Sequence, residues 1–191
     1  MGCLTAEPVS QTRAPEVIPR SGLTLLAASI LLITLSWPSS LFASYDVLAL
    51  TLEADFEQLK KDRDQESEER EGKIILMGDG ERKDPINIQV KTRGKFRLER
   101  KNCSFPPLRL NFPGDGLEGT VMEGQDKLKL VTHCRDNGTY EQNVLEEYLA
   151  YRMYNLFTDL SLRARLARVT YVDSRGKDDP VENEENETDL G

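Results

Sequence analysis

The sequence predicts an α+β domain, in which a mostly antiparallel sheet of about five or six strands has one long helix packed on its apolar face. Two patterns lead to this prediction. Several short stretches alternate between apolar and polar residues, which is typical of strands with one buried face. Residues 139–160 instead repeat their apolar residues every three to four positions, which is typical of an amphipathic helix. A sheet and a helix that each have one apolar face are expected to bury those faces against each other.

The first half of the domain contains two predicted strands and an acidic segment. Residues 47–52 are apolar with partial alternation and predict the first strand, and residues 56–60 predict one or two helical turns. Residues 62–71 hold six acids and two bases, a run typical of a solvated loop or a frayed helix. The apolar run 73–77 predicts a second strand, and the Gly-Asp-Gly sequence at 78–80 indicates the turn that ends it.

Regular alternation follows in the second half of the domain. Apolar residues occupy every second position in residues 86–90, 108–112 and 128–130, and again in a last strand at residues 167–171. Each run predicts a strand with one buried face and one polar face.

Residues 139–160 form the one long predicted helix. Thr139 and Gln142 have capping-box spacing, and Glu141 suits the positive end of the helix dipole. We expect the apolar stripe of this helix to pack on the sheet. The stripe consists of Leu145, Leu149, Met153, Leu156 and Leu160, widened by Tyr148 and Phe157.

Residues 1–43 have the pattern of a secretory signal peptide. Arg13 and Arg20 precede an apolar run, residues 23–37, and small residues follow before an expected cut after Ala43. The run is shorter than the roughly 20 residues that a membrane-spanning helix needs. The alternative is an uncleaved anchor, which would be the protein's only attachment to a membrane. The prediction is an exported protein, periplasmic or extracellular.

Removal of the signal peptide leaves a single α+β domain, residues 44–177, and an acidic tail, residues 178–191. The tail holds seven acids and no base, and we expect it to be disordered. The formal net charge of the chain is -8. Because the tail and the acidic segment 62–71 account for more than this total, the remaining body is mildly basic.

The cysteines predict one disulfide. Cys3 would leave with the signal peptide, and Cys103 and Cys134 would pair in an oxidising compartment. The alternative is a metal site that also uses His133, but adjacent residues such as His133 and Cys134 rarely point at one ion. His133 is the only histidine, and the chain has no P-loop, GxGxxG or HExxH motif, so we assign no catalytic residue and no metal ligand.

Cations gather on the polar face of the predicted sheet. If the alternation holds, this face would suit phosphate or another polyanion, because Arg and Lys offer charge-assisted contacts to such groups. The alternative is that the cations only keep the sheet face soluble, with neighbouring acids balancing them. Nucleic acid is disfavoured because no aromatic residues are interleaved with the basic ones. The predicted anion-binding residues are Lys91, Arg93, Arg109, Lys127 and Lys129.

Four segments form distinctive motifs: RGKFR at 93–97, CSFPPLRLNF at 103–112, EGQDKLKLVTHC at 123–134 and YEQNVLEEYLAYR at 140–152. Together they resemble a family of uncharacterised exported bacterial proteins. The match covers roughly half of the chain.

The order of these parts is also distantly similar to the N-terminal part of the CotH kinase-like family. Its elements correspond here to Arg93-Gly94, the strand 109–112, the strand 128–131 with Asp136 after it, and Gln142-Asn143. This resemblance implies an atypical phosphotransferase that uses ATP and Mg²⁺, with the cationic face as a phosphate cradle.

The sequence departs from the CotH-like pattern in two ways. Gln142 stands where an arginine is expected, and after Asp173 no second lobe with metal-binding and catalytic acids follows. The resemblance therefore implies an N-terminal lobe, either truncated or a genuine standalone lobe, that lacks the C-terminal part of the enzyme and is inactive alone. The alternative function is a cell-envelope binding module with no nucleotide or catalytic role.

Overall fold

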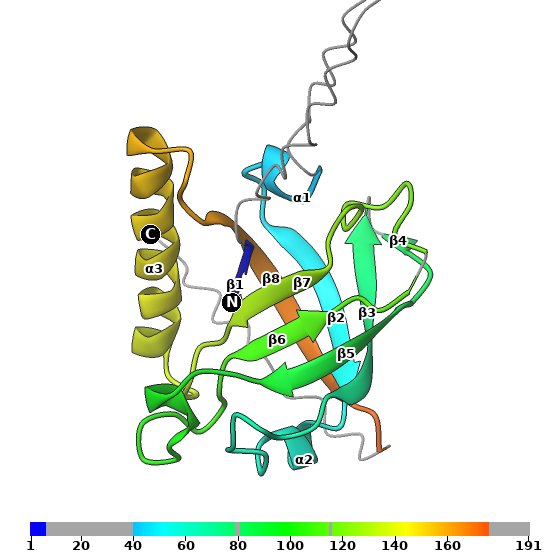
Figure 1. Cartoon of the computed structure of the whole chain (residues 1–191), viewed down its shortest axis with the longest axis vertical. Coiled ribbons are helices and arrows are strands. Elements are labelled where there is room, and N and C mark those ends of the chain that lie inside the picture. The colour runs from blue at the N-terminus through cyan, green and yellow to red at the C-terminus, as the bar shows by residue number, and fades with distance from the viewer. Residues whose placement is uncertain (7–39, 79–80, 115, 176–191) are drawn as a thin grey trace, which may run out of the picture.

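The computed structural model describes residues 1–6, 40–78, 81–114 and 116–175, which form a closed seven-stranded barrel with one long helix on its outside (Figure 1). The strand order is β2-β8-β1-β7-β6-β5-β3, and an additional pairing between β2 and β3 closes the barrel. The strands are β1 (Gly2–Ala6), β2 (Leu48–Ala54), β3 (Arg70–Gly78), β4 (Glu81–Arg82), β5 (Ile86–Thr92), β6 (Leu108–Asn111), β7 (Lys127–Val131) and β8 (Arg163–Asp173). The helices are α1 (Ser40–Ala43), α2 (Phe56–Leu59), the 3-10 turn η1 (Phe96–Leu98) and α3 (Gly138–Phe157).

The prediction of a mixed α+β fold with a mostly antiparallel sheet is confirmed, but the open sheet of five or six strands is not. Within the described residues, only β2 and β8 pair in parallel. The barrel closes because β2 has two partners: Leu50 lies opposite Val169 of β8 and opposite Leu76 of β3. The apolar face of the sheet therefore faces itself across the barrel interior.

The core lies inside the barrel. Inward-facing residues of the strands are almost fully buried, with Leu52, Ile74 and Leu110 at 0% exposure. Residues from the connections complete this core, namely Leu41 of α1, Phe56 and Leu59 of α2, and Met122 of the loop between β6 and β7. Figure 1 shows α1 and α2 beyond opposite ends of the barrel, so the two short helices lie at its two ends.

Helix α3 packs on the outer face of the barrel, not on the apolar face of the sheet as predicted. Its Val144 is buried against Cys3 of β1 and Ala164 of β8, and Tyr148 and Tyr151 pack on the same small cluster. The predicted apolar stripe instead lies largely exposed. This correction has a physical reason: barrel closure already buries the inward faces of the strands, so only a small apolar patch on the outer face remains for a helix.

The N-terminus of α3 also differs from the predicted capping box. Asn137 is the N-cap, and its side-chain oxygen accepts a hydrogen bond from the backbone N–H of Thr139 at 3.0 Å. Asn is as good an N-cap residue as Ser or Thr, because its short side chain reaches the first free N–H groups.

Residues 2–6 of the predicted signal peptide form β1, which lies between β7 and β8. Cys3 lies opposite Val131 on one side and Leu166 on the other, and both Cys3 and Leu4 are at 0% exposure. The remainder of the predicted leader up to residue 39 and the acidic tail 178–191 fall outside the described residues, so the cut after Ala43 and the disorder of the tail stay predictions. No helix in the described part of the chain is long and apolar enough to cross a membrane.

Candidate anion-binding face

Three of the predicted cations stand side by side on neighbouring strands. Lys91 of β5 lies directly opposite Arg109 of β6, and Arg109 lies directly opposite Lys129 of β7. Because neighbouring strands are about 4.8 Å apart, this row spans about 10 Å across the sheet. We call Lys91, Arg109 and Lys129 the cation row.

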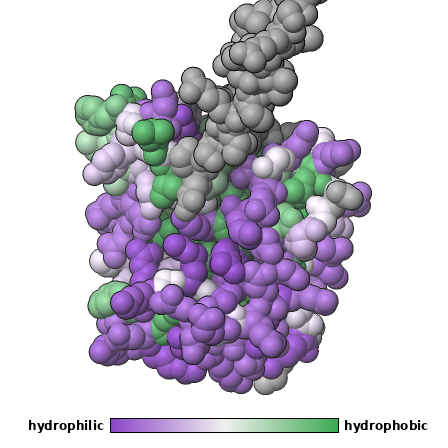
Figure 2. Space-filling model, in the orientation of Figure 1, coloured by the Kyte–Doolittle hydropathy of each residue, from purple (hydrophilic) through white to green (hydrophobic). Residues whose placement is uncertain are grey.

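The cation row is on the outside of the barrel. The residues that alternate with it, Val90, Leu110 and Leu130, are buried in the core, so the pleat directs the row outward. Figure 2 shows a predominantly hydrophilic surface over β5 and β6. Lys127 has the same orientation, two residues before Lys129, and lies opposite Asn111.

Glu69 is a counterion of Arg109 and Lys91 in the row. Its carboxylate accepts hydrogen bonds from Nη2 of Arg109 at 2.6 Å and from the side-chain amide of Asn111 at 3.0 Å. Burial alone would raise the pKa of Glu69, but these hydrogen bonds and the charges of Arg109 and Lys91 hold the pKa below its usual value. Glu69 therefore stays ionised and neutralises part of the row.

The two remaining cations also lie near carboxylates. Lys127 is 3.6 Å from the carboxylate of the exposed Asp126, a surface pair of little strength. Arg93 follows directly after β5, and its backbone N–H donates to the Pro107 carbonyl at 2.8 Å. Burial lowers the pKa of the Arg93 guanidinium, whereas the nearby Glu147 of α3 acts to raise it. Arg93 thus lies at the edge of the face, beside the helix.

Helix α3 flanks the cationic face at its Arg93 end. Glu147 of α3 accepts a hydrogen bond from Arg97 at 3.0 Å and another from the Tyr151 hydroxyl at 3.3 Å. Sequence reasoning correctly grouped the row on one face, but it placed α3 on the opposite side of the sheet. It also missed Glu69, which looked like one of many acids in the segment 62–71.

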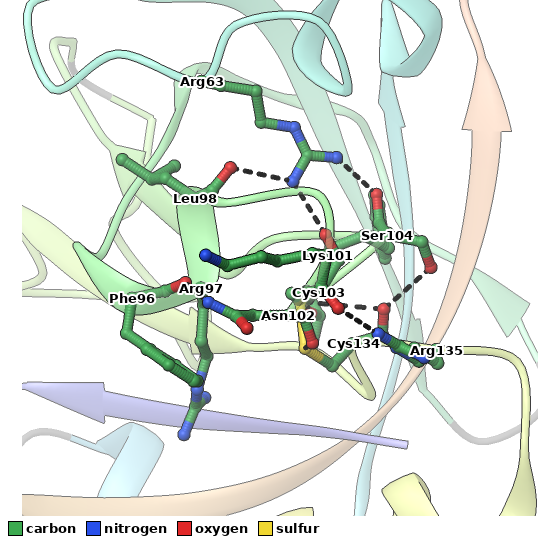
Figure 3. Close-up of a disulfide and its surroundings, with 12 residues drawn as sticks. Arg63, Phe96, Arg97, Leu98, Lys101, Asn102, Cys103, Ser104, Cys134 and Arg135 are labelled. Carbon is green, nitrogen blue, oxygen red and sulfur yellow. Dashed lines mark hydrogen bonds between the residues drawn. A yellow bond between two sulfur atoms is a disulfide. The ribbon is translucent and has the colours of Figure 1, made fainter.

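The disulfide between Cys103 and Cys134 is present, as predicted (Figure 3). It joins the loop after η1 to the segment after β7. Nη1 of Arg63 donates to the carbonyls of Leu98 and Cys103 at 3.3 and 2.9 Å, and Nη2 donates to that of Ser104 at 2.5 Å. A disulfide is compatible with a compartment outside the cytoplasm.

An open depression lies beside this disulfide loop, and no residue of the cation row lines it. Its volume is about 590 Å³, and its lining mixes the cations Arg63, Lys95 and Arg100 with the acids Asp64 and Glu99. Because its two acids offset most of the charge of its three cations, it is a weaker anion site than the row.

The residues around the row do not fit a nucleotide–Mg²⁺ site of the kind implied by the CotH-like resemblance. Magnesium takes oxygen ligands, usually one or two carboxylates. The oxygens of Glu69 are already engaged by Arg109 and Asn111, and Asp126 lies beside Lys127. The described residues contain no group of three His, Cys, Asp or Glu placed to hold a metal ion.

Comparison of the chain with protein-family models, with curated proteins and with solved structures finds no match. The case for a function therefore depends on the geometry of the site.

Proposed function

We propose that this protein is a non-catalytic binding module of the cell envelope, and that its cation row engages an anionic polymer rich in phosphate or carboxylate groups. The register of Lys91, Arg109 and Lys129 across three strands carries the proposal, because it aligns three cations on an outward surface. The disulfide supports a site of action outside the cytoplasm.

The shape of the surface favours a polymer over a nucleotide. The outside of a closed barrel is convex, so the row has no walls that would enclose a small ligand, whereas small-molecule sites are usually concave. An extended polyanion can lie across adjacent strands and contact several cations at once. Each contact at about 4 Å in high dielectric is worth about 1 kcal/mol, so the affinity depends on their number.

The test is equilibrium dialysis of the full chain against inorganic polyphosphate at low and high ionic strength. We expect the double substitution K91Q/R109Q to weaken binding at least tenfold, because it removes two of the three charges of the row and leaves Glu69 without its arginine. Binding of the unchanged protein should fall steeply between 0.1 and about 1 M salt, as the Debye length shortens from about 10 to about 3 Å.

Arg168 provides the matched control. It is an exposed arginine of β8, a strand separated from β7 by β1, and it lies opposite Ala49 of β2. R168Q should leave polyphosphate binding within twofold of the unchanged protein. Equal losses from R168Q and from R109Q would show that only net charge matters and would overturn the proposal. Mg²⁺-dependent binding of ATP in preference to polyphosphate would instead support the nucleotide-binding lobe that the CotH-like resemblance implies.

A further inference from the structure

Helix α3 presents a second apolar face, directed away from the barrel. Four of its apolar residues and Leu160 just after it are more than half exposed: Leu149 57%, Met153 61%, Leu156 81%, Phe157 81% and Leu160 85%. The spacing of the four helical residues places them within about 100° of one another around the helix axis, opposite Val144 and Tyr151, which pack on the barrel. Leu160 follows just beyond the end of the helix. We call these five residues the outer stripe. Figure 2 shows hydrophobic residues gathered over the C-terminal end of α3, at the upper left of the molecule.

An exposed apolar patch of this kind marks an interaction surface. Exposed single hydrophobic residues are ordinary, but here the exposure continues along about two turns of the helix and increases toward its end. The question is which apolar partner covers it.

The chain itself brings an apolar segment to this end of the molecule. Residues 7–39 leave β1 after Ala6 and return at α1. Ala6 lies opposite Arg163, only three residues after Leu160. At the other end of the segment, the Leu41 carbonyl of α1 accepts a hydrogen bond from Nη1 of Arg165 at 3.0 Å. Both attachment points therefore lie at the first residues of β8, next to the most exposed part of the outer stripe.

A contact also joins α3 to the chain just after α1. The guanidinium of Arg152 stacks over the ring of Tyr45, 4.0 Å from its centroid, just after α1. Arg152 precedes Leu156 by one helical turn, so the chain beyond α1 is held against α3 beside the outer stripe.

The segment has the composition and the length to cover the outer stripe. Residues 23–37 are 15 residues without a charge, which would measure about 22 Å as a helix. The helical part of the stripe, from Leu149 to Phe157, extends about 12 Å on the same rise per residue. Trp37 is three residues before Ser40 and so within about 11 Å of it, whereas the 16 residues 7–22 can span about 50 Å from Ala6. The run can thus lie along α3 with Trp37 near its C-terminal end.

We propose that the outer stripe of α3 is the docking surface for the apolar segment Leu23–Trp37 of the same chain. Attachment at both ends raises the effective concentration of the segment to the millimolar range, which favours it over a separate partner. The proposal is independent of the polyanion function. It applies to the chain that keeps its first 43 residues, as the position of β1 in the barrel requires.

The test uses Trp37, the only tryptophan in the sequence, as a fluorescent reporter in the full chain. We expect blue-shifted emission that resists acrylamide quenching in the unchanged protein. The double substitution L156D/L160D should shift the emission to longer wavelength and raise the quenching constant at least threefold. Both leucines are more than 80% exposed, so this variant should fold, which its thermal unfolding curve will verify.

Phe96 is the matched control, because it is 70% exposed on η1. F96D should leave both the emission and the quenching of Trp37 unchanged. Solvent-exposed emission in the unchanged protein, or equal shifts from L156D/L160D and F96D, would overturn the proposal. A shift that depends on protein concentration would assign the stripe to a second copy, and one seen only with phosphatidylglycerol vesicles would assign it to a membrane; either result would also overturn the proposal.

Discussion

Cys3 is the one cysteine outside the disulfide, and it lies in the interface between β1 and α3. Its side chain is at 0% exposure, packed with Val131, Val144 and Ala164. Burial, helped by the nearby charge of Glu147, raises the pKa of the thiol to about 12. Because the thiolate is the reactive form, a thiol held neutral and buried should be inert.

We therefore predict that Cys3 does not react with a thiol reagent such as Ellman's reagent while the protein is folded at pH 8. In denaturant without reductant, one equivalent of thiol should react, since the other two cysteines are paired.

The same raised pKa makes folding sensitive to alkali: the thiol ionises in the unfolded chain near pH 9 but not in the folded one. The stability contributed by this group is thus complete below about pH 9 and declines as the pH rises above it. Prompt reaction of one thiol in the native protein would show that β1 is not seated.

At the scale of elements, strict alternation of apolar and polar residues was the reliable signal. It predicted β5, β6 and β7 and the shared face of Lys91, Arg109 and Lys129, because a strand with one buried side can adopt only one register. Barrel closure was not predictable in this way, since the pairing of β2 with both β3 and β8 joins segments far apart in the sequence.

The prediction of which face of α3 is buried was wrong for a different reason. The helix has two apolar faces, and the larger one, with its leucines, suggested the buried side. The face that packs on the barrel uses Val144, Tyr148 and Tyr151 against small residues such as Cys3 and Ala164. Hydrophobic periodicity identifies a helix, but it cannot decide between two apolar faces. Strand β1 was missed because GCLTA is short, does not alternate and precedes a signal-like run.

Gly72 gives a test of the packing between elements. It lies in β3 between Ala54 of β2 and Ile88 of β5. A Cβ at this position would lie 2.9 Å from the Glu53 carbonyl oxygen and 2.9 Å from Cγ2 of Val90. Since the carbonyl belongs to the backbone of a paired strand, it cannot move aside cheaply.

We predict that G72A destabilises the protein by about 1–3 kcal/mol, the usual cost of overpacking, in equilibrium urea unfolding. The entropy gained by replacing glycine, under about 1 kcal/mol, offsets only part of this. The control is G138A at the first residue of α3, where an added Cβ meets nothing within 4 Å. G138A should be neutral or slightly stabilising, and similar losses from both substitutions would contradict the close packing at Gly72.

On the scale of the whole molecule, β1 ties the first residues of the chain to the last strand. It bridges β7 and β8, and the barrel has no other strand between them. A cut after Ala43 would remove this strand. An anchor that crossed a membrane once at residues 23–37 would place residues 1–6 and the barrel on opposite sides. Either outcome would break the pairing of Leu4 and Leu130, so this pair provides a test of the predicted leader.

Leucine-to-alanine substitutions at this pair separate the two states. Leu4 and Leu130 lie opposite each other, and both are at 0% exposure in the core. With β1 seated, L4A and L130A should each lower the free energy of unfolding by about 2–5 kcal/mol, the usual cost of a buried leucine. The loss of stability in the double variant should differ from the sum of the two single losses, because contacting residues are coupled. If β1 is absent from the barrel, L130A should still lower the free energy of unfolding, whereas L4A should leave it unchanged because Leu4 then contacts nothing. Urea unfolding of the full-length chain, with its intact mass verified, distinguishes these results. An L4A variant as stable as the unchanged protein would favour the removable leader. Similar losses of stability from L4A and L130A would establish the N-terminus as part of the fold.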